Sequence, residues 1–321
     1  MRQPGFEVTV VEPDRKSSIE LSVAGKSVRI SNPDRVCFSA RGETKLDLAR
    51  YYLSVGEGII RALRERPCML HRFPRGVDGD KVHQKRLPSG APAWVETVRV
   101  QFPSGRHADE LCVTDLAAVI WAVQMATVEF HPWNSRRSDT ERPDEWRIDL
   151  DPMPDCRLDR VRRVASVAHE VLEELGAVGW PKTSGGSGLH IYVRIEPQWG
   201  FTDVRRAALA FAREVERRAP ADATTTWWRK DREPDKVFVD YNQNARDHTI
   251  ASAYSVRGAS EATVSTPITW DEIEDAMPQD FTIATVPARF AKLGDLHGGI
   301  DDAAFSVEPL LAWADRDERS T

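Results

Sequence analysis

Two aspartates separated by one residue are the strongest chemical signal in the sequence. In the segment WRIDLDP, residues 146–152, alternate side chains of a strand would share a face, so Asp149 and Asp151 would project together while Ile148 and Leu150 face a core. Neighbouring carboxylates repel each other unless a cation lies between them, and hard oxygen ligands favour Mg²⁺ or Mn²⁺. The pair predicts a divalent-metal site, with two exposed aspartates before a proline turn as the alternative.

A third aspartate follows another strand-like run. In VFVDY, residues 237–241, the same period places Asp240 on the face opposite Val237 and Val239. Three aspartates on neighbouring strands suit a two-metal centre for phosphoryl transfer, in which the ions are roughly 3.5–4 Å apart. The alternative for Asp240 is a turn cap before Asn242.

A glycine-rich loop lies between these two segments, in PKTSGGSGLHIYVRI, residues 181–195. Glycines permit positive φ and close backbone approach, so such a loop can direct N–H groups and hydroxyls at phosphate oxygens. It is neither a Walker A loop nor a Rossmann fingerprint, and a plain surface turn is the alternative. A strand after the loop would send Leu189, Ile191, Val193 and Ile195 into a core and His190, Tyr192 and Arg194 to the other face.

Two further residues are candidates for chemistry, His131 as a catalytic group and Arg257 as a phosphate ligand. His131, in FHPW, directly follows an apolar helical pattern, where an imidazole is usually a partner of the helix C-terminus. Arg257, in YSVRG, could clamp a phosphate with its planar guanidinium, and a surface salt bridge is the alternative.

The elements that must position these residues alternate between strands and helices. Patterns predict a strand-like segment over 18–30 and a helix from an N-cap at Thr44, with Asp47 in its first turn, toward Arg66. A core helix follows Thr114 or Asp115. Two amphipathic helices, strands and a polar tail complete the chain: a helix from Leu158 to a C-cap at Gly176, a helix capped by Thr202 that ends before Pro220, strands over 237–257, and the tail ADRDERST. The pattern is typical of an α/β or α+β fold in two unequal lobes.

Composition sets outer limits on function. The 321 residues carry a net charge of −6, so the chain has no global footprint of a nucleic-acid binder, and any such contact must come from basic clusters at 61–75, 81–86 and 227–232. Without a membrane-spanning apolar run or an evident leader, a cytoplasmic protein is expected. The widely spaced cysteines predict reduced, mostly buried thiols rather than a zinc site: Cys37, Cys68, Cys112 and Cys156.

Several segments in order carry a family resemblance. FHPW, RIDLDP, KTSGGSGLHIYV, VFVDYNQNARDHTIASAYSVRG and VSTPITWDEI together resemble the polymerase domain of bacterial DNA ligase D, a member of the archaeo-eukaryotic primase superfamily that acts in non-homologous end joining. The resemblance extends over roughly residues 20–300. It implies a primase-polymerase-like core with mixed or antiparallel sheets flanked by helices. It also implies an order of an extension at 1–20, a smaller basic DNA-binding lobe at 21–110, a catalytic core at 111–305 and a polar tail at 306–321.

The resemblance also implies roles for individual residues. Asp149, Asp151 and Asp240 become the metal-binding catalytic residues. The expected nucleotide-binding residues are Ser184, Gly186, Ser187, His190, Arg257, His131 and Gln243. The expected DNA-binding residues are Arg35 and Lys45, for the 5′-phosphate at a gap or break, and Val82, His83 and Lys85, for the template strand. Two features depart from the family pattern, since Ser187 replaces a lysine and Val82-His83 replaces an aromatic pair.

The implied function is templated nucleotide addition that fills gaps and extends ends in double-strand break repair. The resemblance implies two Mn²⁺ or Mg²⁺ ions, nucleoside triphosphate substrates with a preference for ribonucleotides, and action at the nucleoid beside Ku and a DNA ligase. The sequence contains no Lys-x-Asp-Gly ligase motif, so an excised domain and a stand-alone paralogue are both open. The alternative functions are a DxD glycosyltransferase and a catalytically weak module that binds DNA ends.

Overall fold

The chain folds into two compact units, each built from segments that lie far apart in the sequence. The computed structural model describes residues 10–11, 18–102 and 104–319. Unit 1 takes Met1–Pro132, Ala251–Val264 and Phe281–Gly294, and unit 2 takes Trp133–Ile250, Ser265–Asp280 and Asp295–Thr321. The division therefore does not follow the expected boundary between residues 110 and 111, because two later segments of the chain return to unit 1.

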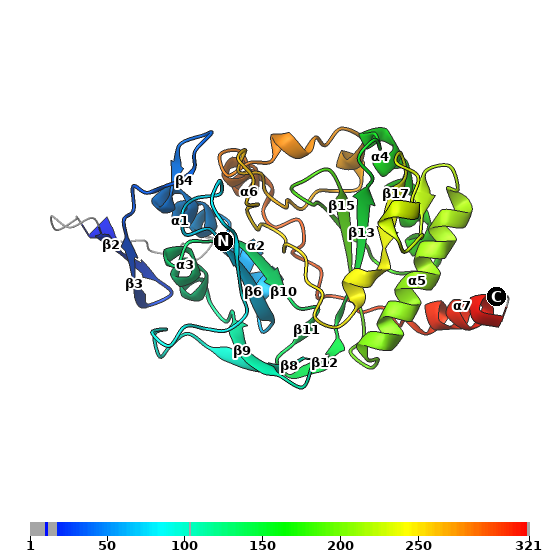
Figure 1. Cartoon of the computed structure of the whole chain (residues 1–321), viewed down its shortest axis with the longest axis horizontal. Helices are drawn as coiled ribbons and strands as arrows, with labels where there is room; N and C mark the ends of the chain where they lie inside the picture. The colour runs from blue at the N-terminus through cyan, green and yellow to red at the C-terminus, as the bar shows by residue number, and fades with distance from the viewer. Residues whose placement is uncertain (1–9, 12–17, 103, 320–321) are drawn as a thin grey trace. The chain divides into compact units, whose positions relative to one another are not determined.

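Unit 1 combines small antiparallel sheets with four helices (Figure 1). Its main sheet has the order β10-β6-β9-β8, and β7 pairs with β6. The residues expected to form one strand-like segment are a hairpin, because Ala24 and Gly25 adopt positive φ of 49° and 73° and reverse the chain. The elements are β1 Val10–Val11, β2 Ser18–Val23, β3 Lys26–Ser31, β4 Val36–Phe38, β5 Glu43–Thr44, α1 Lys45–Ser54, α2 Gly56–Leu63, β6 Pro67–Arg72, β7 Val82–Gln84, β8 Thr97–Gln101, β9 His107–Cys112, α3 Leu116–Gln124, β10 Thr127–Pro132 and α6 Val286–Leu293.

The first helical segment of unit 1 confirms its predicted start but not its predicted length. The Thr44 side chain accepts a hydrogen bond from the Asp47 N–H, and the Asp47 carboxylate accepts one from the Thr44 N–H, which forms a capping box. The expected single helix is broken at Val55, whose φ and ψ of −110° and 23° are not helical. The break lets α2 approach α3 closely, because a Cβ at Gly56 would lie 2.8 Å from the Leu116 side chain.

Unit 2 is built on a five-stranded mixed sheet with the order β14-β15-β13-β17-β16. Only β16 and β17 pair in parallel within this sheet. This confirms the expected mixed α/β architecture. The elements are β11 Ser135–Arg136, β12 Asp139–Pro143, β13 Glu145–Pro152, α4 Leu158–Glu174, β14 Trp180–Thr183, β15 Leu189–Arg194, α5 Phe201–Arg218, β16 Ala223–Thr224, η1 Arg229–Asp231, β17 Val237–Asp240, η2 Tyr241–Asn244, η3 Asp271–Glu274, η4 Pro278–Asp280 and α7 Glu308–Arg319.

Helices α4 and α5 cover one face of this sheet (Figure 1). Ile148 and Leu150 are buried, as expected from the alternation of β13. On the same face, the Trp146 ring meets Phe211 of α5 edge to face, with ring centroids 4.8 Å apart. The period of two therefore directs Asp149 and Asp151 to the opposite face.

Strand β15 has the predicted alternation of apolar and polar side chains, but it is buried on both faces. His190, Tyr192 and Arg194 share the face opposite the apolar side chains, as expected, but all three are buried. Tyr192 packs there with Ile250 and Ile300, and Trp180 packs against this cluster. Part of the polar face of the sheet is therefore covered by later segments of the chain.

The chain after β17 does not continue as strands. It forms η2 and then irregular backbone, because the buried Asn244 side chain takes the hydrogen bonds that a neighbouring strand would make with Arg147. The Asn244 side-chain oxygen accepts from the Arg147 N–H at 2.9 Å, and its NH₂ donates to the Arg147 carbonyl at 2.8 Å. The predicted strands up to residue 257 are therefore wrong beyond Asp240.

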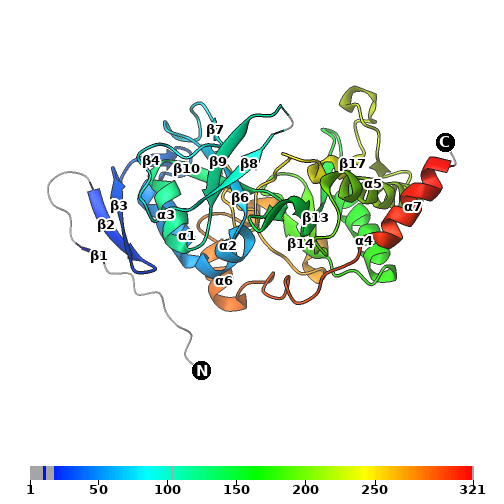
Figure 2. The same cartoon turned by 90° about the horizontal axis from the view of Figure 1, so that it is seen from below.

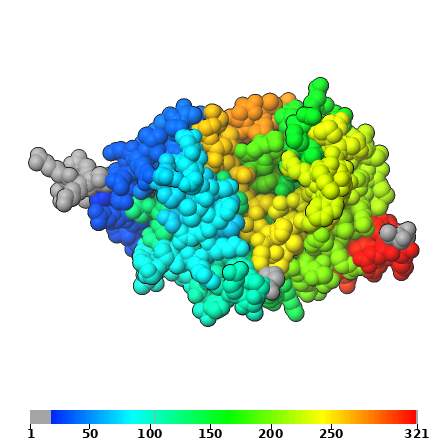
Figure 3. Space-filling view, in the orientation of Figure 1, coloured from blue at the N-terminus to red at the C-terminus, as the bar shows by residue number. Residues whose placement is uncertain are grey.

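Two predicted helix boundaries also change, and the expected polar tail contains a helix. Helix α5 begins at Phe201 with Gly200 as its N-cap, so Thr202 lies inside the first turn. Leu175 is the C-cap of α4, and Gly176 follows it with a φ of 68°. The expected polar tail contains α7, which lies against α5 at the surface (Figure 3). Arg206 of α5 ties the two helices together by ion pairs with Asp315 and Glu318.

The structure agrees with the predictions for the cysteines and for membrane-spanning segments. All four cysteines are thiols, and three of them are buried: Cys37, Cys68 and Cys112. Among the described residues, no helix combines the length and the apolar character needed to cross a bilayer.

Because His297 is buried, we expect the free energy of unfolding of unit 2 to fall in acid. Its Nε2 donates to the Pro181 carbonyl at 3.0 Å, and burial lowers its pKa to about 4, against about 6.5 in an unfolded chain. Between these values the unfolded chain binds more protons, so the free energy of unfolding should fall as the pH drops from 6.5 toward 4. His297→Gln keeps the donor and should reduce this loss by about 1–3 kcal/mol in urea titrations at several pH values. The exposed His248 gives the control, since an equal effect of His248→Gln would contradict the assignment.

Candidate active site

The three predicted aspartates lie on one face of the unit 2 sheet. Asp149 of β13 is directly opposite His190 of β15 on one side and directly opposite Asp240 of β17 on the other. Asp151 lies two residues further along β13, on the same face. The strand register therefore brings Asp149, Asp240 and His190 together as neighbours, as the sequence predicts for the two carboxylates.

The charges of this face suit a divalent cation. Burial raises the pKa of the Asp151 carboxyl, the Arg229 guanidinium lowers it, and the Asp240 carboxylate raises it again. Arg229 Nη1 lies 4.0 Å from Asp151 Oδ2. A cation between the carboxylates would remove their repulsion, and their oxygens are the ligands that Mg²⁺ and Mn²⁺ prefer. The residues present therefore fit the metal ions that the resemblance implies.

Asp240 also has the turn-capping role that the sequence left open. Its Oδ1 accepts from the Asn242 N–H at 2.8 Å, and its Oδ2 accepts from Gln243 Nε2 at 3.0 Å. Gln243, expected among the nucleotide-binding residues, thus contacts a carboxylate of the predicted metal site. Both hydrogen bonds fix the orientation of the Asp240 side chain.

A buried lysine is a hydrogen-bond partner of His190. Lys182 of β14 is opposite His190 in the strand register, and its Nζ lies 2.7 Å from His190 Nδ1. An ammonium group has no lone pair, so Nδ1 accepts this hydrogen bond and the ring proton of a neutral His190 is on Nε2. Nε2 lies 3.5 Å from Asp149 Oδ1. Lys182, which also bonds to the Ser265 hydroxyl, is a functional candidate that sequence reasoning missed.

The glycine-rich loop is shaped by its own serine and packs against β13. Ser184 Oγ accepts from the N–H groups of Gly186 and Gly188 at 3.0 and 3.1 Å, and Gly185 has a φ of 73°. A Cβ at Gly188 would lie 2.5 Å from the Leu150 carbonyl oxygen, so only glycine fits there. Gly186 and Ser187 are exposed at the tip of the loop. The loop is therefore held next to the strand that carries Asp149.

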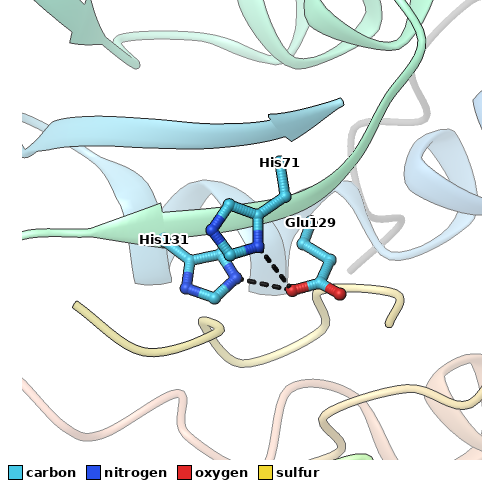
Figure 4. Close-up of side chains that lie close together, drawn as sticks. All are labelled: His71, Glu129 and His131. Atoms are coloured by element: carbon cyan, nitrogen blue, oxygen red, sulfur yellow. Dashed lines mark hydrogen bonds and ion pairs between the residues drawn. The ribbon is translucent and has the colours of Figure 1, made fainter. Parts of the chain in front are cut away.

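Unit 1 contains a second buried polar cluster, formed by His71, Glu129 and His131 (Figure 4). His71 of β6 is directly opposite Glu129 of β10. Glu129 Oε2 lies 3.0 Å from His71 Nδ1 and 2.7 Å from His131 Nε2. Gly258 donates its N–H to Glu129 Oε1 at 2.7 Å, and Arg257 Nε lies 3.6 Å from Oε2. Glu129 thus brings together His131 and Arg257, two of the predicted nucleotide-binding residues.

The charges of this cluster are fixed by Glu129. Burial alone would raise the pKa of Glu129, but hydrogen bonds from His131 and His71 and the nearby Arg257 hold it far below its usual range. Burial lowers the pKa of His131 to about 4, so its ring is neutral at pH 7. Two histidines and a glutamate with ligand atoms within 4.8 Å form a donor set for a transition metal. However, the carboxylate already accepts from two rings and a backbone N–H beside a guanidinium, which disfavours an added cation.

Sequence reasoning missed His71 and Glu129, although one signal was present. Glu129 and His131 are two residues apart in β10 and therefore share a face. Only the pairing of β10 with β6 adds His71.

The predicted 5′-phosphate residues differ in their surroundings. Arg35 is exposed, whereas Lys45 is buried and its Nζ donates to the carbonyls of Ser31 and Gln124 at 2.7 and 3.4 Å. Burial lowers the pKa of Lys45. The two residues are neighbours, since the Lys45 N–H donates to the Arg35 carbonyl at 2.8 Å. Arg35 is therefore the accessible member of the pair.

The predicted template residues and one basic cluster lie at the surface. Val82 and His83 of β7 are exposed, and the His83 ring lies 4.5 Å from that of His71. Lys85 Nζ lies 4.5 Å from the centroid of the Phe102 ring. In unit 2, the loop between β16 and β17 projects from its sheet (Figure 2) and exposes Trp227 and Trp228 beside basic residues.

Comparisons with known proteins agree on one family. Residues 44–297 match the family model described as LigD, primase-polymerase domain. The chain is 33% identical over 302 residues to the multifunctional non-homologous end joining protein LigD of Pseudomonas aeruginosa, and 31% identical over 288 residues to that of Mycolicibacterium smegmatis. These alignments cover 91% and 89% of this chain but only 36% and 38% of the two relatives.

A solved structure shows the same fold. The polymerase domain of Mycobacterium tuberculosis ligase D, solved in complex with DNA, matches with a TM-score of 0.81 at 30% sequence identity. The match covers 86% of this chain and 99% of that one.

Proposed function

Because the chain belongs to the LigD primase-polymerase domain family, we propose that it is a templated nucleotidyltransferase that fills gaps and extends ends during DNA break repair. The observation that carries this proposal is the register of β15, β13 and β17, which places Asp149 between His190 and Asp240. A glycine-rich loop held against β13 adds groups suited to phosphate.

The proposed reaction joins a primer to a nucleotide. The primer 3′-hydroxyl loses its proton and its oxygen bonds to the α-phosphorus of a nucleoside triphosphate, while the bond to pyrophosphate breaks. Asp149, Asp151 and Asp240 would hold divalent cations, Mn²⁺ or Mg²⁺, which supply charge neutralisation at the reacting oxygens. Asn242 and Gln243 hold the Asp240 carboxylate in place, and Lys182 contacts His190 Nδ1 while His190 Nε2 lies 3.5 Å from Asp149.

Each unit has groups that we assign to the nucleotide or to DNA. In unit 2, Ser184, Gly186, Ser187 and His190 are assigned to the triphosphate. In unit 1, His131 and Arg257 are assigned to the nucleotide. Val82, His83 and Lys85 are assigned to the template, and the exposed Trp227 and Trp228 can stack on bases. Support for DNA as partner comes from the solved relative, which contains DNA.

The biological setting follows the named relatives, of whose length this chain spans less than two fifths. Their names place them in non-homologous end joining, so we propose that this chain adds nucleotides, preferably ribonucleotides, at breaks that Ku holds and a DNA ligase seals.

The direct test is nucleotide addition to a gapped duplex with a 5′-phosphate. Ribonucleotides and deoxyribonucleotides are each supplied with Mn²⁺ or Mg²⁺, and products are resolved by length and by dependence on the template base. Templated addition in at least one condition is expected. Binding to the gapped duplex without any addition would refute the polymerase and favour an end-binding module.

Replacing Arg35 should weaken capture of a 5′-phosphate. We expect Arg35→Ala to reduce affinity for gapped DNA with a 5′-phosphate about 5- to 10-fold, because a charged hydrogen bond is lost. The same variant should change affinity for 5′-hydroxyl DNA less than 2-fold. Arg50, an exposed arginine of α1, provides the matched control as Arg50→Ala. Equal losses on both DNAs would show diffuse electrostatic attraction instead. Lys45 is less informative, since its ammonium also holds two backbone carbonyls.

A further inference from the structure

The two histidines of unit 1 each turn one ring nitrogen to Glu129 and the other away from it. The inner nitrogens are His71 Nδ1 and His131 Nε2, at 3.0 and 2.7 Å from the same carboxylate oxygen. The outer nitrogens, His71 Nε2 and His131 Nδ1, are buried and have no hydrogen-bond partner among the described residues. The two rings lie against each other, with centroids 3.7 Å apart.

The ionised carboxylate decides which nitrogen carries the proton. Glu129 has no proton to give, so each inner nitrogen must be the N–H donor. A neutral ring then has a lone pair, and no proton, on its outer nitrogen. Each outer nitrogen can therefore only accept a hydrogen bond.

The surrounding charges disfavour a second proton on the His131 ring. Glu129 offers one negative charge, which the Arg257 guanidinium and the Gly258 N–H already balance. The His83 ring, tilted by 47° with its centroid 4.5 Å from that of His71, gives no negative charge. A second proton on the His131 ring would meet Arg257 and the His71 imidazole with no additional anion among these groups. Phosphate oxygens at neutral pH are acceptors, so two acceptor nitrogens suit a different part of a nucleotide.

We propose that Glu129 is a positioning residue that fixes His71 and His131 as hydrogen-bond acceptors for a sugar hydroxyl of the nucleotide. The inference rests on the proposed function for the identity of the ligand. It adds His71 and Glu129 to the residues that act on the nucleotide, and it assigns His131 to the sugar of that nucleotide. The two possible sources of the hydroxyl are the 2′ and the 3′ position.

Replacing Glu129 by glutamine tests the positioning role because a carboxamide has only one acceptor oxygen. If that oxygen faces the two rings, the NH₂ meets the Gly258 N–H, and if it faces Gly258, the NH₂ meets the ring N–H groups. At least one donor must change, so the fixed ring tautomers should be lost. Glu57→Gln, at an exposed position of α2, is the matched control.

The experiment determines the tautomers of His71 and His131 and the equilibrium binding of nucleotides, both with the full chain. Long-range proton–nitrogen spectra of histidine-labelled protein at pH 7.5 report which ring nitrogen is protonated, with His71→Gln and His131→Asn as assignment variants. Binding of ATP, 2′-deoxy-ATP, 3′-deoxy-ATP and tripolyphosphate is measured without DNA. We expect Nδ1–H in His71, Nε2–H in His131, and affinity for one deoxy analogue about 3- to 10-fold below that for ATP. In Glu129→Gln this ratio should fall below 2-fold while tripolyphosphate affinity stays unchanged.

Other outcomes overturn the proposal. An imidazolium signal from His131 in the ATP complex, or an equal loss of ATP and tripolyphosphate affinity in Glu129→Gln, would show a phosphate contact. Equal affinity of the wild-type chain for ATP and both deoxy analogues would refute the hydroxyl contact even if Glu129→Gln does not fold. Templated addition is not used in this test. If no nucleotide is added but ATP still binds more tightly than one deoxy analogue, the proposed function fails and this inference holds. If addition is normal but ATP and both deoxy analogues bind equally, only this inference fails.

Discussion

Asp149→Ala is expected to lower the rate of nucleotide addition on gapped DNA by about 10³-fold or more, because it removes charge stabilisation at the reacting oxygens. Asp149 is the central carboxylate of the predicted metal site, opposite Asp240 in the strand register and 3.5 Å from His190 Nε2. Its loss takes away a predicted metal ligand and the carboxylate next to His190 together. The measurement is single-turnover addition of one templated nucleotide.

The folded state should tolerate this change. Asp149 faces another carboxylate across the strand pair, so its removal relieves repulsion in the metal-free protein. The melting temperature without metal should therefore stay the same or rise slightly, and added Mn²⁺ should stabilise the variant less than the wild-type chain. Asp271→Ala, at an exposed aspartate of η3, should retain full activity. A near-normal rate in Asp149→Ala would remove the aspartates from the chemistry.

Gly188→Ala should damage both folding and addition, whereas Gly186→Ala should be tolerated. A Cβ at Gly188 would lie 2.5 Å from the Leu150 carbonyl oxygen, and neither backbone can yield without moving the loop or β13. Overpacking of this kind costs about 1–3 kcal/mol of unfolding free energy. The displaced loop should also slow addition about 10- to 100-fold, since small misplacements of phosphate-binding groups are costly.

Gly186→Ala is the control for Gly188→Ala within the same loop. A Cβ there would meet only Ser184 Oγ, at an ordinary 3.5 Å. Urea unfolding and KM for the nucleotide, measured on both variants, separate the two outcomes. If Gly186→Ala and Gly188→Ala behave alike, general loop flexibility rather than the contact with Leu150 controls this site.

Alternation along strands is the part of the site that the sequence predicts well. Ile148 and Leu150 are buried while Asp149 and Asp151 take the opposite face, because a strand has a period of two whatever its partners are. The capping box of Thr44 and Asp47 is local in the same sense. The order of several such segments carries the family resemblance, and the comparisons confirm the family and its fold.

Contacts that depend on strand register could not be predicted. Lys182 meets His190, and Glu129 meets His71, only because β14 pairs with β15 and β10 pairs with β6 in one particular alignment. The sequence alone does not give these alignments. The same limit explains the wrong strands after Asp240, where one buried side chain, Asn244, replaces a whole ladder of backbone hydrogen bonds at Arg147.

The interleaved order of the two units has a consequence for synthesis on the ribosome. Unit 1 needs Ala251–Val264 and Phe281–Gly294 in addition to its first segment, which ends at Pro132. At about 5–20 residues per second, these last pieces are made on the order of ten seconds after Pro132. During that interval the Tyr51 hydroxyl lacks the Tyr254 carbonyl to which it donates a hydrogen bond, and Glu129 lacks the Gly258 N–H. The first segment of unit 1 is therefore synthesised well before the residues that complete its hydrogen bonds, so unit 1 can reach its final structure only after Gly294 has been made.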